Sequence, residues 1–251
     1  MQAAPVRGIL HKPGEPQFLN PAMLTLNTFE IAIPPQVIDD LRPFAREAQA
    51  METPREVFTL SNGVRLYSEL PGNWASDIRW LSHADEPSYR WFEAIYDRIG
   101  LAAMVAPFVP HDETIRLYAG FLVTRRRCDA LDMHSDWATE ANHAFTLMAP
   151  LTENAGEMGM TFENLRGEQR ELQYRVGKGL VFGTRFPHST SVGQLPERSV
   201  FLCFNFGTDR MDHWQELGAT TGTQGNFFRQ PDGSFVTRAE WLAAGGKPAA
   251  Y

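Results

Sequence analysis

Residues 115–124, IRLYAGFLVT, open a block of short strand-like runs that extends to about residue 207. The later runs are separated by turn-forming residues, and no helical pattern lies between them. They cover residues 144–150, 158–164, 169–176, 179–184 and 199–206. Strands at this spacing indicate an all-β sandwich or barrel.

The residues before this block predict a mixture of irregular chain, a short strand and helices. Residues 1–27 contain four prolines and little periodicity, so we expect an irregular arm. A short strand is expected over residues 28–33. A helix should begin at Pro35, because apolar residues then recur at helical spacing, although Pro43 should strain this helix or end it early.

Two further elements precede the β block, and one follows it. Ser61-Asn62-Gly63 between two apolar runs predicts a hairpin. A second helix is expected from about Pro87 to Gly100. In the less regular tail from Asp209, residues 222–233 are interpreted as a loop, and the pair Thr237 and Glu240 resembles a capping box that opens a short final helix.

Composition and charge exclude some classes of partner. The 251 residues carry a formal charge of −7, which argues against a nucleic-acid partner. The run Arg125-Arg126-Arg127 is interpreted as a solvated strand end. Two cysteines, the lack of a secretory signal pattern and the lack of a long apolar run predict a soluble cytoplasmic protein with no membrane partner.

The sequence contains no internal repeat and no low-complexity linker. We therefore expect one domain over residues 1–251, with an N-terminal arm and helices in about 1–110, a core over about 112–207 and an extension over about 208–251.

Three residues form a candidate metal site. His134 and Asp136 are two positions apart, so in an extended segment both side chains project to the same face. His188 follows 52 residues after Asp136 and offers a second imidazole. Two neutral histidines and one carboxylate form the facial triad typical of non-haem Fe(II) oxygenases, which leaves three coordination positions open. Arg198 follows ten residues after His188, and its guanidinium is suited to bind a carboxylate.

With these four residues the sequence resembles the Fe(II)/2-oxoglutarate-dependent dioxygenase superfamily over residues 112–207. The resemblance implies a mainly β fold with flanking helices, whose core is a double-stranded β-helix, or cupin-like jelly roll. It implies that His134, Asp136 and His188 bind Fe(II), that 2-oxoglutarate takes two metal positions with its distal carboxylate on Arg198, and that dioxygen takes the third. Succinate and carbon dioxide would be products. Because Asp136 is present, the resemblance favours hydroxylation over halogenation. Desaturation, ring closure and epoxidation would use the same ligands, so these outcomes stay open.

Four more residues are candidates for binding roles, each with a structural alternative. Thr190 and Tyr118 would contact 2-oxoglutarate, or else form strand and core. Trp137 and Arg185 would contact substrate, or else serve structural roles. The remaining histidines and both cysteines are expected to be structural.

The function that this pattern favours is oxidation of an unactivated carbon of a small molecule, such as an amino acid derivative or a natural-product intermediate. Three alternatives remain open at the level of sequence. They are a hydroxylase of peptide or protein side chains, a metal-free jelly-roll binding module, and a cupin-like isomerase that uses another divalent metal.

Overall fold

The computed structural model describes residues 9–12, 15–51, 56–71, 74–137, 139 and 142–249. Its first elements correct the expectation of an irregular arm. β1 (Ile9–Lys12), β2 (Glu15–Asn20) and β3 (Thr25–Leu26) form a three-stranded sheet. The prolines do not prevent these strands, because β1 and β2 pair with Pro16 opposite His11. Proline content alone does not reveal such pairing.

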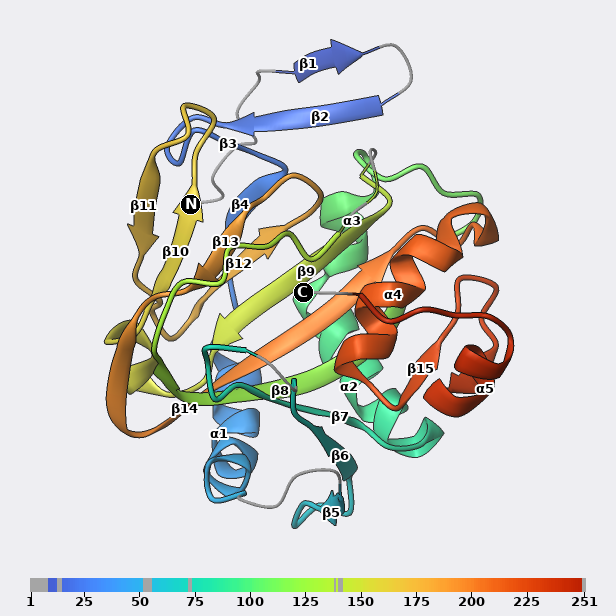
Figure 1. Cartoon of the computed structure of the whole chain (residues 1–251). Helices are drawn as coiled ribbons and strands as arrows, with labels where there is room; N and C mark the ends of the chain where they lie inside the picture. The colour runs from blue at the N-terminus through green and yellow to red at the C-terminus, as the bar shows by residue number, and fades with distance from the viewer. Residues whose placement is uncertain are drawn as a thin grey trace.

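An eight-stranded antiparallel sheet forms the body of the molecule (Figure 1). Its order is β4-β12-β9-β14-β8-β7-β6-β5, so strands distant in sequence become neighbours. The bounds are β4 Thr28–Ala32, β5 Val57–Thr59, β6 Arg65–Glu69, β7 Arg79–His83, β8 Arg116–Cys128, β9 Ala144–Pro150, β12 Lys178–Phe182 and β14 Gly193–Gly207. The expected strand over 28–33 and the hairpin at Asn62-Gly63 are confirmed, with Gly63 at φ +87 as such a turn requires.

A smaller sheet packs against one face of this large sheet. Its order is β11-β10-β13, with β10 at Met160–Glu163, β11 at Gln169–Leu172 and β13 at His188–Thr190. Met160 and Phe162 of the small sheet share one apolar cluster with Phe121 and Phe201 of the large sheet. Two facing antiparallel sheets confirm the expected jelly-roll core.

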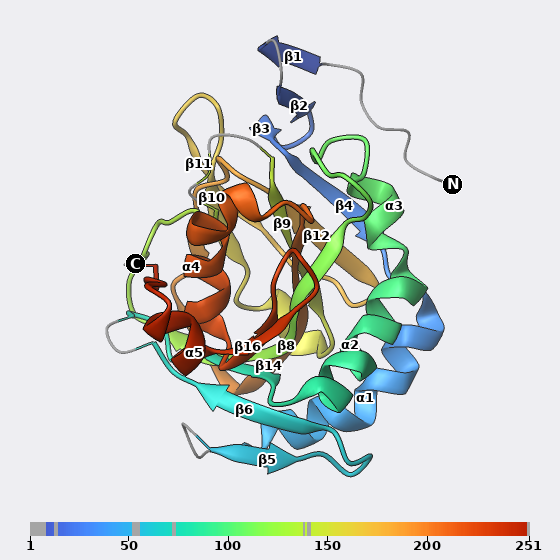
Figure 2. The ribbon, with the colours of Figure 1, turned by 90° about the vertical axis from the view of Figure 1, so that its right-hand side faces the viewer.

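Two helices cover the opposite face of the large sheet (Figure 2). α1 (Pro35–Gln49) lies against β14, and α2 (Glu86–Ile99) lies against β8. Successive residues of a strand point to opposite faces. In β14, Leu202 and Phe204 therefore pack with the helices, whereas Phe201 and Cys203 face the small sheet.

The helix ends follow the sequence signals with one exception. Gly100 is left-handed at φ 77 and ends α2 where expected, before the short α3 (Leu101–Val105). Pro43 does not end α1, which continues to Gln49. Proline has no N–H, so the carbonyl of Asp39 lacks its helical donor. Both residues lie on the exposed side of α1, where this carbonyl is open to solvent.

The C-terminal tail is more regular than expected. After a 3₁₀ turn (Met211–His213), α4 extends over Trp214–Gln224 and is followed by β15 (Phe227–Arg229) and β16 (Phe235–Thr237), so a loop over 222–233 is wrong. The threonines and glycines of α4 are poor helix formers, but Trp214 and Leu217 are buried, and that packing decides the conformation. α5 (Arg238–Ala243) begins with the predicted capping box.

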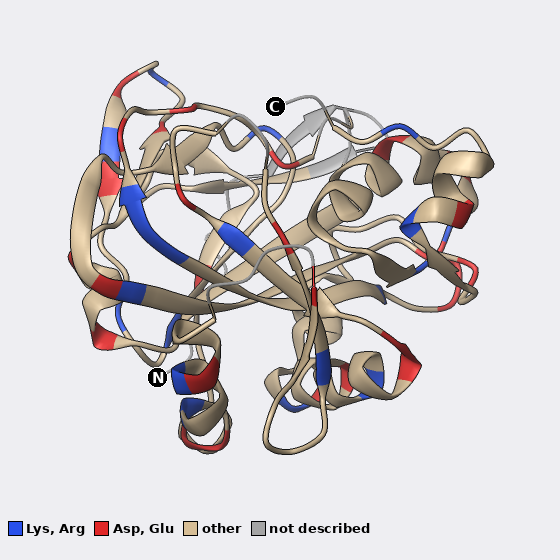
Figure 3. Cartoon of the chain, turned by 60° about the horizontal axis from the view of Figure 1, so that its bottom comes forward, with Lys and Arg blue, Asp and Glu red and all other residues tan. Residues whose placement is uncertain are grey.

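Acidic and basic residues alternate over the ribbon, and Figure 3 shows no continuous basic band on the described part of the chain. Among the described helices, none has the length and apolar character needed to cross a bilayer.

Candidate metal centre

The two histidines of the candidate site are joined through their backbones. His134 lies in the segment after β8, and His188 begins β13. The His134 amide donates to the His188 carbonyl at 3.0 Å, and the His188 amide donates back at 2.8 Å. Because paired residues of an antiparallel bridge project to the same side, both imidazoles point the same way, with their ring centroids 4.7 Å apart.

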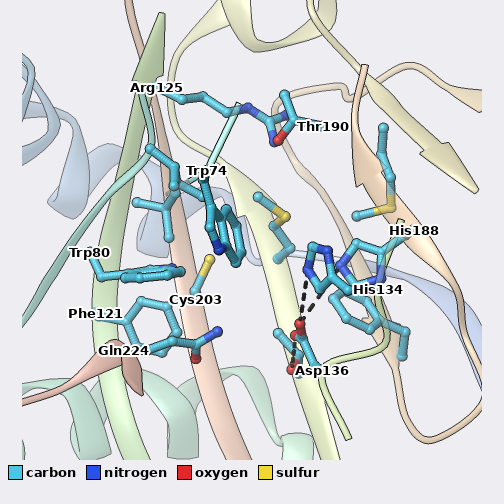
Figure 4. A pocket seen from close by; sticks show the side chains of 16 residues that line it. Trp74, Trp80, Phe121, Arg125, His134, Asp136, His188, Thr190, Cys203 and Gln224 are labelled. Atoms are coloured by element: carbon cyan, nitrogen blue, oxygen red, sulfur yellow. Dashed lines mark hydrogen bonds and ion pairs between the residues drawn. The ribbon is translucent and has the colours of Figure 1, made fainter. Parts of the chain in front are cut away.

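The carboxylate of Asp136 completes the group (Figure 4). Its Oδ1 lies 3.6 Å from Nε2 of His134 and 3.8 Å from Nε2 of His188. One ligand atom from each of the three residues lies within 4.8 Å of the other two. Separations of 3.6 and 3.8 Å are too long for hydrogen bonds. Donor atoms on one face of an ion at about 2.1 Å are about 3.0 Å apart, so the three side chains would draw together on binding an ion.

Both imidazoles are held in the form that binds a metal through Nε2. Nδ1 of His134 lies 2.7 Å from the carbonyl of Asp132, and Nδ1 of His188 lies 3.0 Å from that of Phe186. A carbonyl only accepts, so Nδ1 donates the proton in each pair, and in the neutral ring Nε2 is the nitrogen that has the lone pair. Burial lowers the pKa of His188 to about 4, which keeps this ring neutral at pH 7.

Asp136 is oriented by a short chain of hydrogen bonds. Thr146 Oγ1 donates to Asp136 Oδ2 at 2.9 Å and accepts from Trp137 Nε1 at 3.1 Å. The Thr220 hydroxyl donates to the Asp136 backbone carbonyl. Oδ2 is thus occupied by Thr146, and Oδ1 is left to face the imidazoles.

The three candidate ligands lie in the wall of a cavity that also contains Arg125 and Thr190 (Figure 4). Arg125 is 2% exposed. Its Nη1 donates to Thr190 Oγ1 at 2.8 Å, and its guanidinium lies 4.5 Å from the centre of the Phe201 ring. No carboxylate among the described residues forms an ion pair with Arg125, and its buried Nε has no hydrogen-bond partner there. A buried cation without a counter-charge is costly, so this end of the cavity favours an anion.

Arg198 does not lie in this cavity, contrary to the sequence-based expectation. The neighbouring Ser199 pairs with Arg125 across the β14 and β8 ladder, so those two share the inner face. Arg198 therefore projects to the opposite face, where it forms an ion pair with Asp77 at 3.1 Å.

The structure brings only one of the other four candidates into the cavity. Thr190 lines it beside Arg125. Tyr118 lies at an irregularity of the β8 and β14 pairing, where its hydroxyl donates to the Thr208 carbonyl at 2.6 Å and its ring packs on Trp214. Trp137 is 1% exposed, and its indole Nε1 donates to Thr146, whose hydroxyl in turn bonds to the Asp136 carboxylate. Arg185 is exposed in a turn with φ 60. Tyr118, Trp137 and Arg185 are all absent from the lining.

Sequence reasoning missed several residues of the lining. Arg125 was interpreted as part of a solvated run, although it continues the inner-face alternation of Phe121 and Val123 in β8. That two-residue period is the signal that identifies it. Trp74, Trp80, Thr146 and Gln224 also line the cavity, and no motif marks them.

Comparisons with known proteins identify the fold. No protein-family model and no curated sequence matches the chain. Among solved structures, the apoform of EctD from S. alaskensis has a TM-score of 0.52 at 11% identity and covers 73% of either chain. The non-haem alpha ketoglutarate dependent epimerase SnoN from nogalamycin biosynthesis has a TM-score of 0.51 at 14% identity, covering 73% of this chain and 79% of SnoN.

HygX from Streptomyces hygroscopicus, solved with nickel, 2-oxoglutarate and hygromycin B, has a TM-score of 0.50 at 14% identity and covers 76% of this chain and 88% of HygX. At such low identity these likenesses concern the fold. The chain therefore shares the double-stranded β-helix of structures that include 2-oxoglutarate-dependent enzymes.

Proposed function

We propose that this protein is an Fe(II)- and 2-oxoglutarate-dependent oxygenase that hydroxylates an unactivated carbon of a small molecule. One observation carries the proposal. A cavity between the two sheets has three convergent ligand atoms in its wall and a buried arginine without a counter-charge at one end. An enzyme that binds a metal and a dicarboxylate side by side needs both features.

In this proposal His134, Asp136 and His188 hold the iron. The donor set fits: two neutral imidazoles and one carboxylate are the facial ligands of non-haem Fe(II) sites, and both Nδ1 atoms bond to backbone carbonyls, which leaves each Nε2 to face the site. Bound iron with 2-oxoglutarate supplies the oxidising chemistry that the amino acids lack. The protein's part is to fix the ligands, and the hydrogen bond from Thr146 restrains the Asp136 carboxylate for this purpose.

Arg125 and Thr190 bind the distal carboxylate of 2-oxoglutarate in this proposal. The guanidinium is buried, and two of its nitrogens are already fixed by Thr190 and by the carbonyls of Met158 and Gly159. An incoming carboxylate would neutralise the charge at little ordering cost, because the arginine is held in place before binding. This assignment replaces Arg198, which the large sheet directs away from the cavity.

Two broader parts of the proposal rest on the whole chain. We infer that residues 1–251 act as one oxygenase domain, since the helices at both ends pack on the same sheets that form the cavity. We also infer a cytoplasmic location, which is supported by the free thiols of Cys128 and Cys203.

The function is tested by succinate formation from 2-oxoglutarate with added Fe(II), dioxygen and a panel of small metabolites. His134→Ala and His188→Ala are each expected to abolish it, because two remaining ligands do not hold the metal. His111→Ala, which is remote from the cavity lining, should retain full activity. Undiminished turnover in both ligand variants would reject the proposal.

The carboxylate assignment predicts a difference between two buried arginines. Arg125→Met should raise the KM for 2-oxoglutarate about 100-fold with a smaller change in kcat, since loss of a buried charged partner costs about 2–5 kcal/mol. Steady-state kinetics measure both constants. Arg198→Met should keep KM within about twofold, although melting occurs at a lower temperature because Asp77 loses its partner. A larger rise in KM for Arg198→Met than for Arg125→Met contradicts the assignment.

The restraint on Asp136 predicts that Thr146→Val weakens metal binding by about 10- to 100-fold, because the carboxylate loses the donor that orients it. Anaerobic titration with Fe(II) or Co(II) measures the Kd directly, without turnover. Thr161→Val is the matched control, since Thr161 is equally buried but bonds to Ser191 instead. Equal metal affinity in wild type and Thr146→Val would show that Thr146 has no positioning role.

A further inference from the structure

At the end of the cavity away from Arg125, across from the triad, aromatic side chains and Gln224 gather, and we call this end the second arm (Figure 4). Its walls are aromatic and aliphatic: Trp80 comes from β7, Phe121 from β8 and Cys203 from β14. Trp74 stands between this arm and the candidate metal ligands, because its ring is 5.2 Å from that of Trp80 and 5.0 Å from that of His134. Such walls favour a flat apolar molecule.

One polar side chain is directed into this arm. Gln224, the last residue of α4, is 5% exposed. Its Oε1 accepts a hydrogen bond from Asn205 Nδ2 at 2.7 Å, which fixes the amide orientation and leaves Nε2 facing the cavity. No hydrogen bond joins Nε2 to any described residue. An amide N–H₂ that opens on a cavity and bonds to no protein group favours a ligand that accepts a hydrogen bond.

The arm carries no formal charge. The ionised or ionisable side chains of the lining are the three candidate metal ligands, the Cys203 thiol and Arg125 at the far end. Burial raises the pKa of Cys203 well above its usual range, so this thiol is neutral. A charged group on the substrate would therefore lose its hydration without gaining a counter-charge.

The cavity as a whole, including the end at Arg125, has a volume of about 50 Å³. Since benzene occupies an apolar cavity of about 150 Å³, a ring enters this arm only if a side chain moves. Trp74 is the one aromatic residue of the lining that is partly exposed, and it lies outside the helices and strands. It is the side chain whose displacement would open the arm.

We propose that the substrate of this site is a neutral, flat and largely apolar ring compound with an oxygen acceptor that is bound by Gln224 Nε2. The inference rests on the proposed oxygenase function, which places the iron beside this arm. It narrows the substrate class, because free amino acids and sugars present charges or several hydroxyls that Gln224 alone cannot satisfy.

The test measures affinity rather than turnover, using the full chain with no added metal or 2-oxoglutarate. Isothermal titration compares coumarin, which only accepts hydrogen bonds, with naphthalene, which has no polar atom, and with indole, which only donates. Coumarin should bind about tenfold more tightly than either, a difference that corresponds to one net hydrogen bond. Coumarin-3-carboxylate, which is anionic, is titrated separately with saturating 2-oxoglutarate so that Arg125 is occupied, and under that condition it should show no measurable binding. Equal binding of naphthalene or indole, tighter binding of the anion, or no binding of coumarin overturns the proposal.

Gln224→Met separates recognition from packing, because methionine keeps the length of the side chain and removes the donor. The preference for coumarin over naphthalene should fall from about tenfold to about one, while the Kd for naphthalene stays unchanged. Gln194→Met, at an exposed position of β14, should keep the preference. A preference that persists in Gln224→Met contradicts the role of Gln224.

The two proposals fail in different ways. Selective coumarin binding without any iron-dependent succinate formation would reject the oxygenase and leave the binding arm intact. Succinate formation that is stimulated by charged or polyhydroxylated metabolites, but not by neutral ring compounds, would reject the substrate class and leave the oxygenase intact.

Discussion

The backbone pair between His134 and His188 is the constraint on which the rest of the site depends. His134 follows a strand of the large sheet, and His188 begins a strand of the small sheet, so their two hydrogen bonds join the sheets at one point. The pair also directs both imidazoles to one side, where Asp136 meets them two residues further along the chain. The position of a metal thus follows from a single β-bridge that ties the segment after β8 to β13.

The alternation of side chains along β8 and β14 determines what surrounds that position. Inner residues such as Phe121, Arg125 and Cys203 line the cavity, and outer residues such as Leu202 pack on the helices. One end of the cavity therefore has the buried cation Arg125, and α4 adds the amide of Gln224 at the other end. This separation is why we propose distinct places for an anionic cosubstrate and a neutral substrate.

Local sequence signals identified the strand block, the hairpin at Asn62-Gly63 and the three convergent side chains, because each depends on neighbours or on a short motif. Arg125 was missed because the run of three arginines was interpreted by its charge, whereas the two-residue alternation from Phe121 and Val123 places Arg125 on the inner face. α4 was missed because its threonines and glycines are poor helix formers, and tertiary packing outweighs their propensity. Trp74 and Gln224 belong to no motif, so only the folded chain brings them to the cavity.

The central claim is that three side chains bind one ion beside an anion site formed by Arg125. An anaerobic crystal structure with Fe(II) and 2-oxoglutarate, with data collected at the iron absorption edge, tests it most directly. We expect one anomalous peak at about 2.1 Å from Nε2 of His134, Nε2 of His188 and an Asp136 oxygen, with the distal carboxylate on Arg125. An iron peak that lacks any of these three ligands, or a carboxylate that contacts Arg198 instead, would contradict the claim.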